Sequence, residues 1–236
     1  MISSLLSGDF DLIGFLLRIP IVLIALSVHE CAHGYAAYKM GDPTAKAFGR
    51  LTLNPIKHLD LFGTISMFLF GFGWAKPVPI NARNFKDPRK GMALSALAGP
   101  VTNLILGTIG VFLYYLAICI ANTETAFGVL IQNETAFVAV QMVMTFFYYF
   151  AYLNFLYTVF NLIPVPPFDG SRIFSVVLPQ KAYFSIMKYE RYYLIAILGI
   201  SILCSRLFNF SPFAFLADKL FELISIPFTF IFNLIF

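Results

Sequence analysis

Charged residues are scarce in this chain. Only 12% of its 236 residues are Asp, Glu, Lys or Arg, whereas a soluble globular domain carries about 25%. Cysteine is rare as well, with three in the whole chain, which excludes a disulfide scaffold. The net charge of +4 is small and no basic tract alternates with aromatic residues, so no nucleic-acid partner is expected. These shortages exclude an ordinary soluble enzyme and a nucleic-acid-binding protein.

Apolar residues take the place of the missing charge. They make up 59% of the chain, including 28 Phe and 12 Tyr, and the mean hydropathy is +0.81. A helix needs about 20 apolar residues to cross the hydrocarbon core of a bilayer. The candidate stretches are Phe10–Tyr38, Met92–Ala121, Ala136–Leu162, Tyr192–Phe208 and Phe213–Phe236. The sequence therefore predicts an all-α polytopic membrane protein with about five transmembrane helices.

The first and last apolar stretches need separate interpretation. The first is too long for the apolar region of a signal peptide and lacks a small-residue cleavage site, so we expect a retained helix. The last carries Asp218, Lys219 and Glu222, so its first half is expected to lie along the membrane interface. No repeat or linker divides the chain, which predicts a single membrane-embedded domain over residues 1–236. Its core would cover about residues 10–175, with C-terminal helices at about 182–236.

Lysine and arginine are distributed unevenly between the apolar stretches. Nine lie between Lys39 and Lys90, none lies in Asn122–Thr135, and four lie in Ser171–Arg191. Cytoplasmic connections of membrane proteins carry an excess of these residues. The alternation predicts an N-terminus outside the membrane and both basic connections in the cytosol.

The first basic connection contains an apolar segment, Leu61–Trp74, that is short for a span and rich in glycine. It suits a re-entrant element, which is tolerated at membrane depth where protein covers its backbone. Pro77 and Pro79 follow at alternate positions, a pattern typical of an extended edge strand. We therefore expect a re-entrant or β-hairpin element between the first and second spans.

A metal-binding pattern stands near the inner end of the first span. His29 and His33 are four residues apart, so on a helix both imidazoles lie on one face and can reach one zinc ion. Glu30 is placed to act as a base toward a water at the metal's open position. The alternative is a pair of interfacial histidines that bond to neighbouring helices. Zinc binding is favoured, because ionisable residues within a membrane are costly and usually functional.

A hydrolytic zinc site requires a third protein ligand. Asp169 is the best candidate, because it follows Pro164, Pro166 and Pro167, which must unwind the chain after the third span. A helix-capping turn at Asp169 is the alternative interpretation. His58 is the second choice of ligand, and further acidic candidates on the same side are Asp42, Asp60, Asp87 and Glu190.

Several motifs follow one another along residues 25–175. They are His29, Glu30 and His33 in the first span, Gly41–Pro43, Gly49–Pro55 with His58, Lys76–Pro79, Gly99–Pro100 with Asn103, and Asn161, Pro164, Asp169 and Gly170 after the third span. In these motifs the chain resembles the site-2 protease family of intramembrane zinc metalloproteases, in particular the compact group without a PDZ domain. That family usually has Leu before the Asp of its Asp-Gly pair, where this chain has the conservative replacement Phe168.

The resemblance implies an endopeptidase that hydrolyses transmembrane substrates near the cytosolic leaflet, in regulated proteolysis or the clearance of signal-peptide remnants. It implies one zinc ion per chain held by His29, His33 and Asp169, with Glu30 as the catalytic acid and base. Asn103 and Asn161 would be polar groups around the reacting peptide. The residues themselves leave two alternatives open, which are a helix-packing role for Asn103 and a backbone-bonding role for Asn161.

Two further expectations come from the residues directly. The segment Lys76, Pro77, Val78 and Pro79 is expected to bind an extended substrate by main-chain pairing.

The alternative functions are a metal transporter and a catalytically inactive membrane-protein binder. A transporter should carry polar residues across the bilayer midplane, whereas the ionisable residues here concentrate at one depth. An inactive binder should have lost Glu30, a ligand or the Asp-Gly pair, and all are present.

Overall fold

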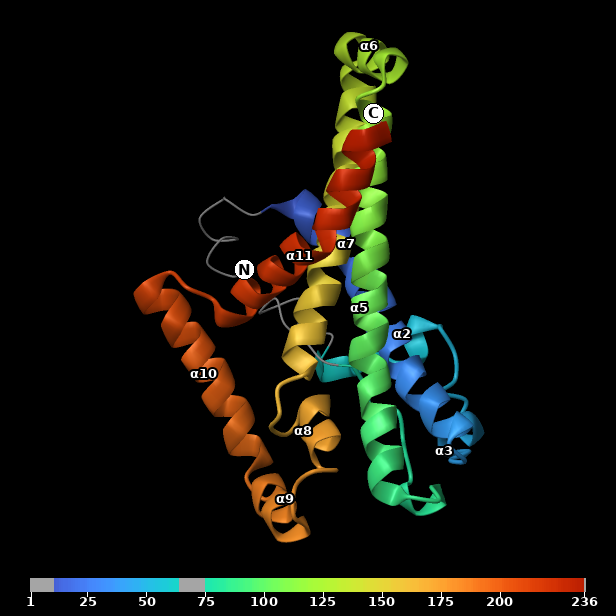
Figure 1. Ribbon diagram of the computed structural model, residues 1–236, viewed down its shortest axis with the longest axis vertical. Coiled ribbons are helices and arrows are strands. Elements are labelled where there is room, and N and C mark those ends of the chain that lie inside the picture. The colour runs from blue at the N-terminus through green and yellow to red at the C-terminus, as the bar shows by residue number, and fades with distance from the viewer. Residues whose placement is uncertain (1–10, 64–74, 236) are drawn as a thin grey trace.

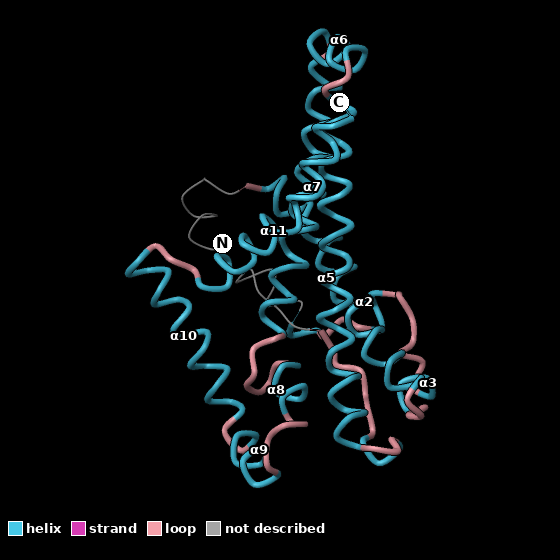
Figure 2. Tube along the Cα trace, in the orientation of Figure 1, coloured by secondary structure: helices cyan, strands magenta, loops and turns pink. Residues whose placement is uncertain are grey.

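The computed structural model describes residues 11–63 and 75–235, and this part of the chain is built from helices joined by turns and loops (Figure 1, Figure 2). Its helices are α2 (Leu12–Lys39), α3 (Thr44–Ala47), α5 (Pro88–Ala121), α6 (Glu124–Gln132), α7 (Glu134–Asn161), α8 (Asp169–Phe174), α9 (Gln180–Met187), α10 (Glu190–Phe208) and α11 (Pro212–Ile235). Two short 3₁₀ turns, η1 (Pro55–Lys57) and η2 (Ala82–Asn84), lie between α3 and α5. The predicted all-α class is confirmed.

Three of these helices, α2, α5 and α7, are long and apolar enough to cross a membrane. A fourth span results if α10 and α11 are taken as one bent element, with 83° between its two parts. The chain turns there because Asn209 adopts a left-handed conformation at the end of α10, and Pro212 begins the next helix. A multi-pass membrane protein is confirmed. The described helices provide three to four candidate spans, and the expected count of five is not confirmed.

Small residues allow the long helices to pack closely. A Cβ added to Gly110 of α5 would lie 2.8 Å from the backbone nitrogen of Ala151 on α7, so the two backbones are almost in contact. A buried cluster of Val111, Ala151, Phe155 and Ala217 joins α5, α7 and α11. Figure 1 shows α11 lying along the upper part of the α5–α7 pair, while α2 and α8 contact its lower part. The lower part is therefore where the first span and Asp169 meet.

Local sequence explains the ends of the helices that frame this region. The Asp87 carboxylate accepts hydrogen bonds from the backbone N–H groups of Arg89 and Lys90, and Pro88 occupies the first helical position of α5, a favourable N-terminus. Helix α7 ends at Asn161, and helical structure resumes at Asp169. The proline-rich stretch between them is unwound, as the sequence predicts.

The connection between α2 and α5 departs from its prediction. Most of the expected re-entrant element, residues 64–74, lies outside the described residues. An isolated antiparallel bridge joins Leu59 and Ala75, but residues 76–80 form no β-strand. Pro77 and Pro79 have no N–H to donate, and the N–H groups of Lys76 and Val78 bond to single acceptors elsewhere. In place of an edge strand, residues 76–80 form an irregular segment that is held by separate hydrogen bonds to His58 and Glu30.

Candidate metal centre

Three ligand-type atoms from distant parts of the chain meet beside α5. His29 and His33 lie one turn apart on α2, and their Nε2 atoms are 2.9 Å apart. Asp169 is the first residue of α8, and its Oδ2 atom lies 3.2 Å from Nε2 of His29 and 3.1 Å from Nε2 of His33. The unwound stretch after α7 carries Asp169 to this position. His29, His33 and Asp169 form a group that could hold a metal ion.

The opposite nitrogens of the two imidazoles are fixed by α5. Nδ1 of His29 lies 2.5 Å from Oδ1 of Asn103, and Nδ1 of His33 lies 2.7 Å from the backbone oxygen of Ser95. Because both partners are acceptors, each Nδ1 carries the proton, and each Nε2 directs a lone pair toward Asp169. This is the arrangement by which metal-binding histidines are usually oriented.

The donor set fits a cation. Oδ2 of Asp169 is buried and receives no hydrogen bond from the described residues, although both Nε2 atoms lie at ion-pair distance. One carboxylate and two imidazole lone pairs that converge without a shared proton provide the N and O ligands that Zn²⁺ accepts.

Gly99 makes the approach of α5 to the histidines possible. A Cβ at this position would lie 2.5 Å from Cε1 of His29 and 2.5 Å from Cε1 and Nε2 of His33, far inside normal contact distance. The sequence motif Gly99–Pro100 drew attention to this residue only through family resemblance. Its physical role is to leave room for both rings.

We expect Gly99→Ala to weaken zinc binding by about tenfold or more, since displaced imidazoles lose their alignment much as they do when an outer partner is removed. Titration of the purified protein against a competing chelator would measure this. Gly199→Ala is the matched control, because Gly199 is also in a helix and has open space where the Cβ would be. Equal zinc affinity of the two variants would show that the rings tolerate the methyl group.

Asn103 is fully buried and links three helices. Its Oδ1 faces His29, and its Nδ2 donates to Oδ1 of Asn154 on α7 at 2.9 Å and to the backbone oxygen of Ala25 on α2 at 3.4 Å. The interhelical role that the sequence left open is therefore present, combined with the orientation of His29. The sequence did not single out Asn154, although an amide within the apolar stretch of the third span is a signal for it.

Asn161 is at the end of α7, where its Nδ2 donates to the backbone oxygen of Tyr157 in its own helix at 3.1 Å. This is the backbone-bonding alternative, and the structure shows no contact between Asn161 and the metal-type cluster. His58, the alternative ligand, is buried elsewhere with Nε2 2.8 Å from the backbone oxygen of Thr52. The structure does not bring His58 into the cluster.

Glu30 points toward the segment that was expected to bind substrate. Its Oε2 accepts a hydrogen bond from the backbone N–H of Val78 at 2.8 Å. The Lys76 N–H donates to the backbone oxygen of His58 at 2.7 Å, and the Lys76 oxygen accepts from Arg50 at 2.5 Å. The structure therefore brings Lys76–Val78 beside Glu30.

Asp42 fastens the continuation of this segment. It is fully buried, and it accepts hydrogen bonds from the backbone N–H groups of Thr44 and Asn81 and from the Asn84 amide. Burial raises the pKa of Asp42, but the hydrogen bonds, led by the hydroxyl of Thr44 and the amide of Asn84, lower it overall. Asp42 is therefore an ionised residue that accepts four hydrogen bonds. It holds the main chain around it in place and does not serve as a metal ligand.

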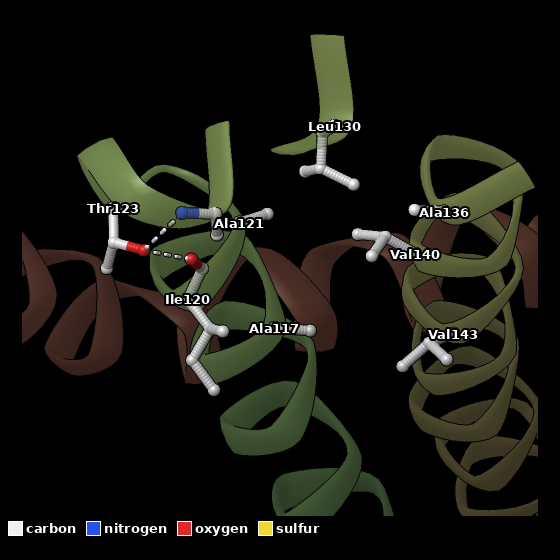
Figure 3. Close-up of a pocket in the computed structure, with 9 residues that line it drawn as sticks. Ala117, Ile120, Ala121, Thr123, Leu130, Ala136, Val140 and Val143 are labelled. Atoms are coloured by element: carbon white, nitrogen blue, oxygen red, sulfur yellow. Dashed lines mark hydrogen bonds between the residues drawn. The ribbon is translucent and has the colours of Figure 1, made fainter. Parts of the chain in front are cut away.

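A separate apolar cavity lies at the other end of the long helices (Figure 3). Its volume is about 600 Å³, and it is lined by Ala117, Ile120, Ala121, Thr123, Ala126, Leu130, Ala136, Val140 and Val143. These residues carry no ionisable group. The cavity therefore takes no part in the chemistry of the His–Asp cluster.

Comparisons with known proteins show which family the chain resembles. Residues 18–204 match the family described as Peptidase family M50. The chain is 45% identical over 171 residues to "Putative zinc metalloprotease YwhC" of Bacillus subtilis (strain 168), covering 72% of this chain and 73% of that protein. It is 28% identical over 164 residues to "Putative zinc metalloprotease Rip2" of Mycolicibacterium smegmatis (strain ATCC 700084 / mc(2)155), covering 66% of this chain and 55% of that protein. No solved structure matches the chain significantly.

Proposed function

The chain belongs to peptidase family M50, and from this premise we propose that it is a zinc-dependent endopeptidase that cleaves transmembrane substrates within the bilayer. The observation that carries the proposal is the convergence of His29, His33 and Asp169, with Glu30 next to His29 in the chain. The test is cleavage of a single-span substrate by the purified, zinc-loaded protein. A metal transporter would bind zinc without cleaving, and an inactive binder would hold the substrate intact.

We assign one zinc ion per chain to His29, His33 and Asp169. When bound, zinc supplies a Lewis acid that polarises a peptide carbonyl and lowers the pKa of water. Glu30 then takes a proton from the attacking water and returns it to the leaving nitrogen. The Val78 N–H occupies Oε2 of Glu30, which leaves Oε1 for this proton. The main chain at Val78 thereby orients the carboxylate.

The Lys76–Pro79 segment is proposed to bind substrate, and the hydrogen bonds within the protein limit which of its main-chain groups are open to a substrate. Its two N–H groups already bond to His58 and Glu30, and its two prolines have none. No described residue donates to the carbonyl oxygens of Pro77 and Pro79. An unwound substrate would therefore donate its own N–H groups to these carbonyls, which is a one-sided version of strand addition.

Deletion of Val78–Ile80 is expected to abolish cleavage while zinc content stays unchanged. The deletion removes the N–H that holds Glu30 and the carbonyls offered to substrate, but no proposed zinc ligand. Metal analysis of the purified variant and a cleavage assay measure the two effects separately. Full activity in the deletion variant would contradict a role for this segment.

Asn103→Ala is expected to lower zinc affinity about 10- to 100-fold, which is the usual cost of removing the outer partner of a metal-binding histidine. Chelator competition measures the change. Thr102→Ala is the matched control, because Thr102 is the preceding residue and its hydroxyl donates within its own helix, to the backbone oxygen of Ala98. Native zinc affinity in Asn103→Ala would mean that His29 is oriented without it.

The proposed orientation places the N-terminus outside and the cluster toward the cytosol. The support is the distribution of lysine and arginine, together with the position of His29 and His33 in the second half of α2, which ends at Lys39. Cleavage would then occur near the cytosolic leaflet. The bilayer and a membrane-embedded protein or peptide substrate are the proposed partners.

A further inference from the structure

Arg50 differs from the basic residues around it because it is buried. Its exposed fraction is 7%, whereas Lys46 and Lys57 are exposed. Among the described residues no carboxylate forms an ion pair with it. A buried charge is costly unless it is hydrogen-bonded, and the partner that Arg50 has is the backbone oxygen of Lys76, 2.5 Å from Nη2.

A short chain of contacts leads from Arg50 to Glu30. Arg50 holds the Lys76 oxygen, and the His58 backbone oxygen accepts the Lys76 N–H at 2.7 Å. Two residues further on, the Val78 N–H donates to Glu30 at 2.8 Å. The Val78 side chain is buried, and a Cβ at Gly34 would lie 3.0 Å from its Cγ1. The main chain is therefore held by hydrogen bonds on both sides of Pro77, at Lys76 and at Val78.

Pro77 makes the main chain between Lys76 and Val78 stiff. Pro77 has a fixed φ, and it also restricts the backbone of Lys76 before it. A displacement of the Lys76 carbonyl must therefore be passed on to the Val78 N–H. Arg50 itself is placed by the turn after α3, where Gly49 adopts a φ of +64° and the Arg50 N–H donates to the Ala45 oxygen at 2.9 Å.

We propose that Arg50 is a positioning residue for catalysis, which fixes the Lys76 carbonyl so that the Val78 N–H holds the Glu30 carboxylate in place. The kinetic part of this inference rests on the proposed function, whereas the structural part does not. Among the described residues Arg50 has no hydrogen bond or ion pair with the proposed ligands, and it acts through the main chain of Lys76–Val78.

Amide hydrogen exchange tests the structural part without any enzymatic assay. Within residues 76–80 only Lys76, Val78 and Ile80 carry a backbone N–H, so a peptide covering this segment reports on few amides. In Arg50→Ala, exchange of the Lys76 and Val78 amides should be about tenfold faster or more, with α5 and α7 unchanged. Lys46→Ala, an exposed neighbour, should leave exchange at its native rate. Native exchange of these amides in Arg50→Ala, or equally accelerated exchange throughout the protein, would overturn the proposal.

Steady-state cleavage tests the kinetic part. Arg50→Ala should lower kcat about tenfold or more, because misplaced catalytic groups cost rate, while KM changes by less than about twofold and zinc content is native. Arg50→Lys retains a positively charged donor group and should recover part of kcat, and added guanidinium should recover part of it in Arg50→Ala. A kcat loss with native exchange, or no rescue by either route, would overturn the positioning role. If the native protein cleaves nothing while exchange responds as expected, the proposed function fails and the Arg50 contact stands.

Discussion

Glu30→Gln is expected to reduce cleavage of a single-span substrate by about 10²- to 10⁴-fold, the usual contribution of a general base, and to leave zinc content at one per chain. Glutamine has the size of glutamate, and its carbonyl oxygen can still accept the hydrogen bond that Val78 donates to Oε2. It cannot take a proton from water. The variant therefore separates proton transfer from the packing and metal binding around it.

The measurement is a paired one, with zinc per chain and cleavage rate determined on the same purified samples. Native zinc with greatly reduced cleavage assigns the proton transfer to Glu30. Cleavage within about twofold of the native rate would exclude Glu30 as the base. Loss of zinc in this variant would show instead that Glu30 supports the metal site.

Asp169→Ala is expected to weaken zinc binding by more than about 100-fold and to abolish cleavage. Removing an outer partner of a ligand already costs about 10- to 100-fold, and Asp169 supplies the only oxygen in the cluster of three. Its backbone is retained in α8, so the helix should persist. Chelator competition measures the zinc affinity, and far-UV circular dichroism checks that the helical content of the variant is native.

His58→Ala is the control that distinguishes the two third-ligand candidates. His58 bonds to Thr52 and lies outside the cluster, so this variant should keep native zinc affinity. If His58→Ala lost zinc and Asp169→Ala retained it, the ligand assignment would be reversed.

The parts that sequence could predict are governed by local rules. Two histidines four residues apart share a helix face wherever the helix lies, and three prolines within four residues end a helix in any context. These rules placed His29 and His33 on one face and unwound the chain before Asp169. The need for a third ligand after the unwound stretch favoured Asp169 over His58, and the family resemblance implied the same choice.

The parts that sequence could not predict depend on contacts between helices. Ser95 supplies a backbone oxygen to His33, and any residue type could do so. Gly99 matters because two imidazoles lie against it, and Asn154 because it bonds to Asn103. The described helices confirm three to four candidate spans rather than five, because apolar length alone does not register the turn at Asn209 that separates α10 from α11.

The expected edge strand shows how a correct pattern can have another outcome. The alternating prolines predicted an extended edge strand, but residues 76–80 form no strand. The N–H groups of Lys76 and Val78 instead bond to His58 and Glu30. The segment Lys76–Pro79 was predicted to pair with substrate. In the structure it lies beside Glu30, to which the Val78 N–H donates a hydrogen bond.

The most direct test of the central claim is metal removal and restoration on the native protein. About one zinc ion per chain should be found, cleavage of the single-span substrate should stop when a chelator removes it, and added zinc should restore the original rate. Cleavage that continues after the zinc has been removed, or a native protein that binds no zinc, would contradict the claim that this chain is a zinc-dependent protease.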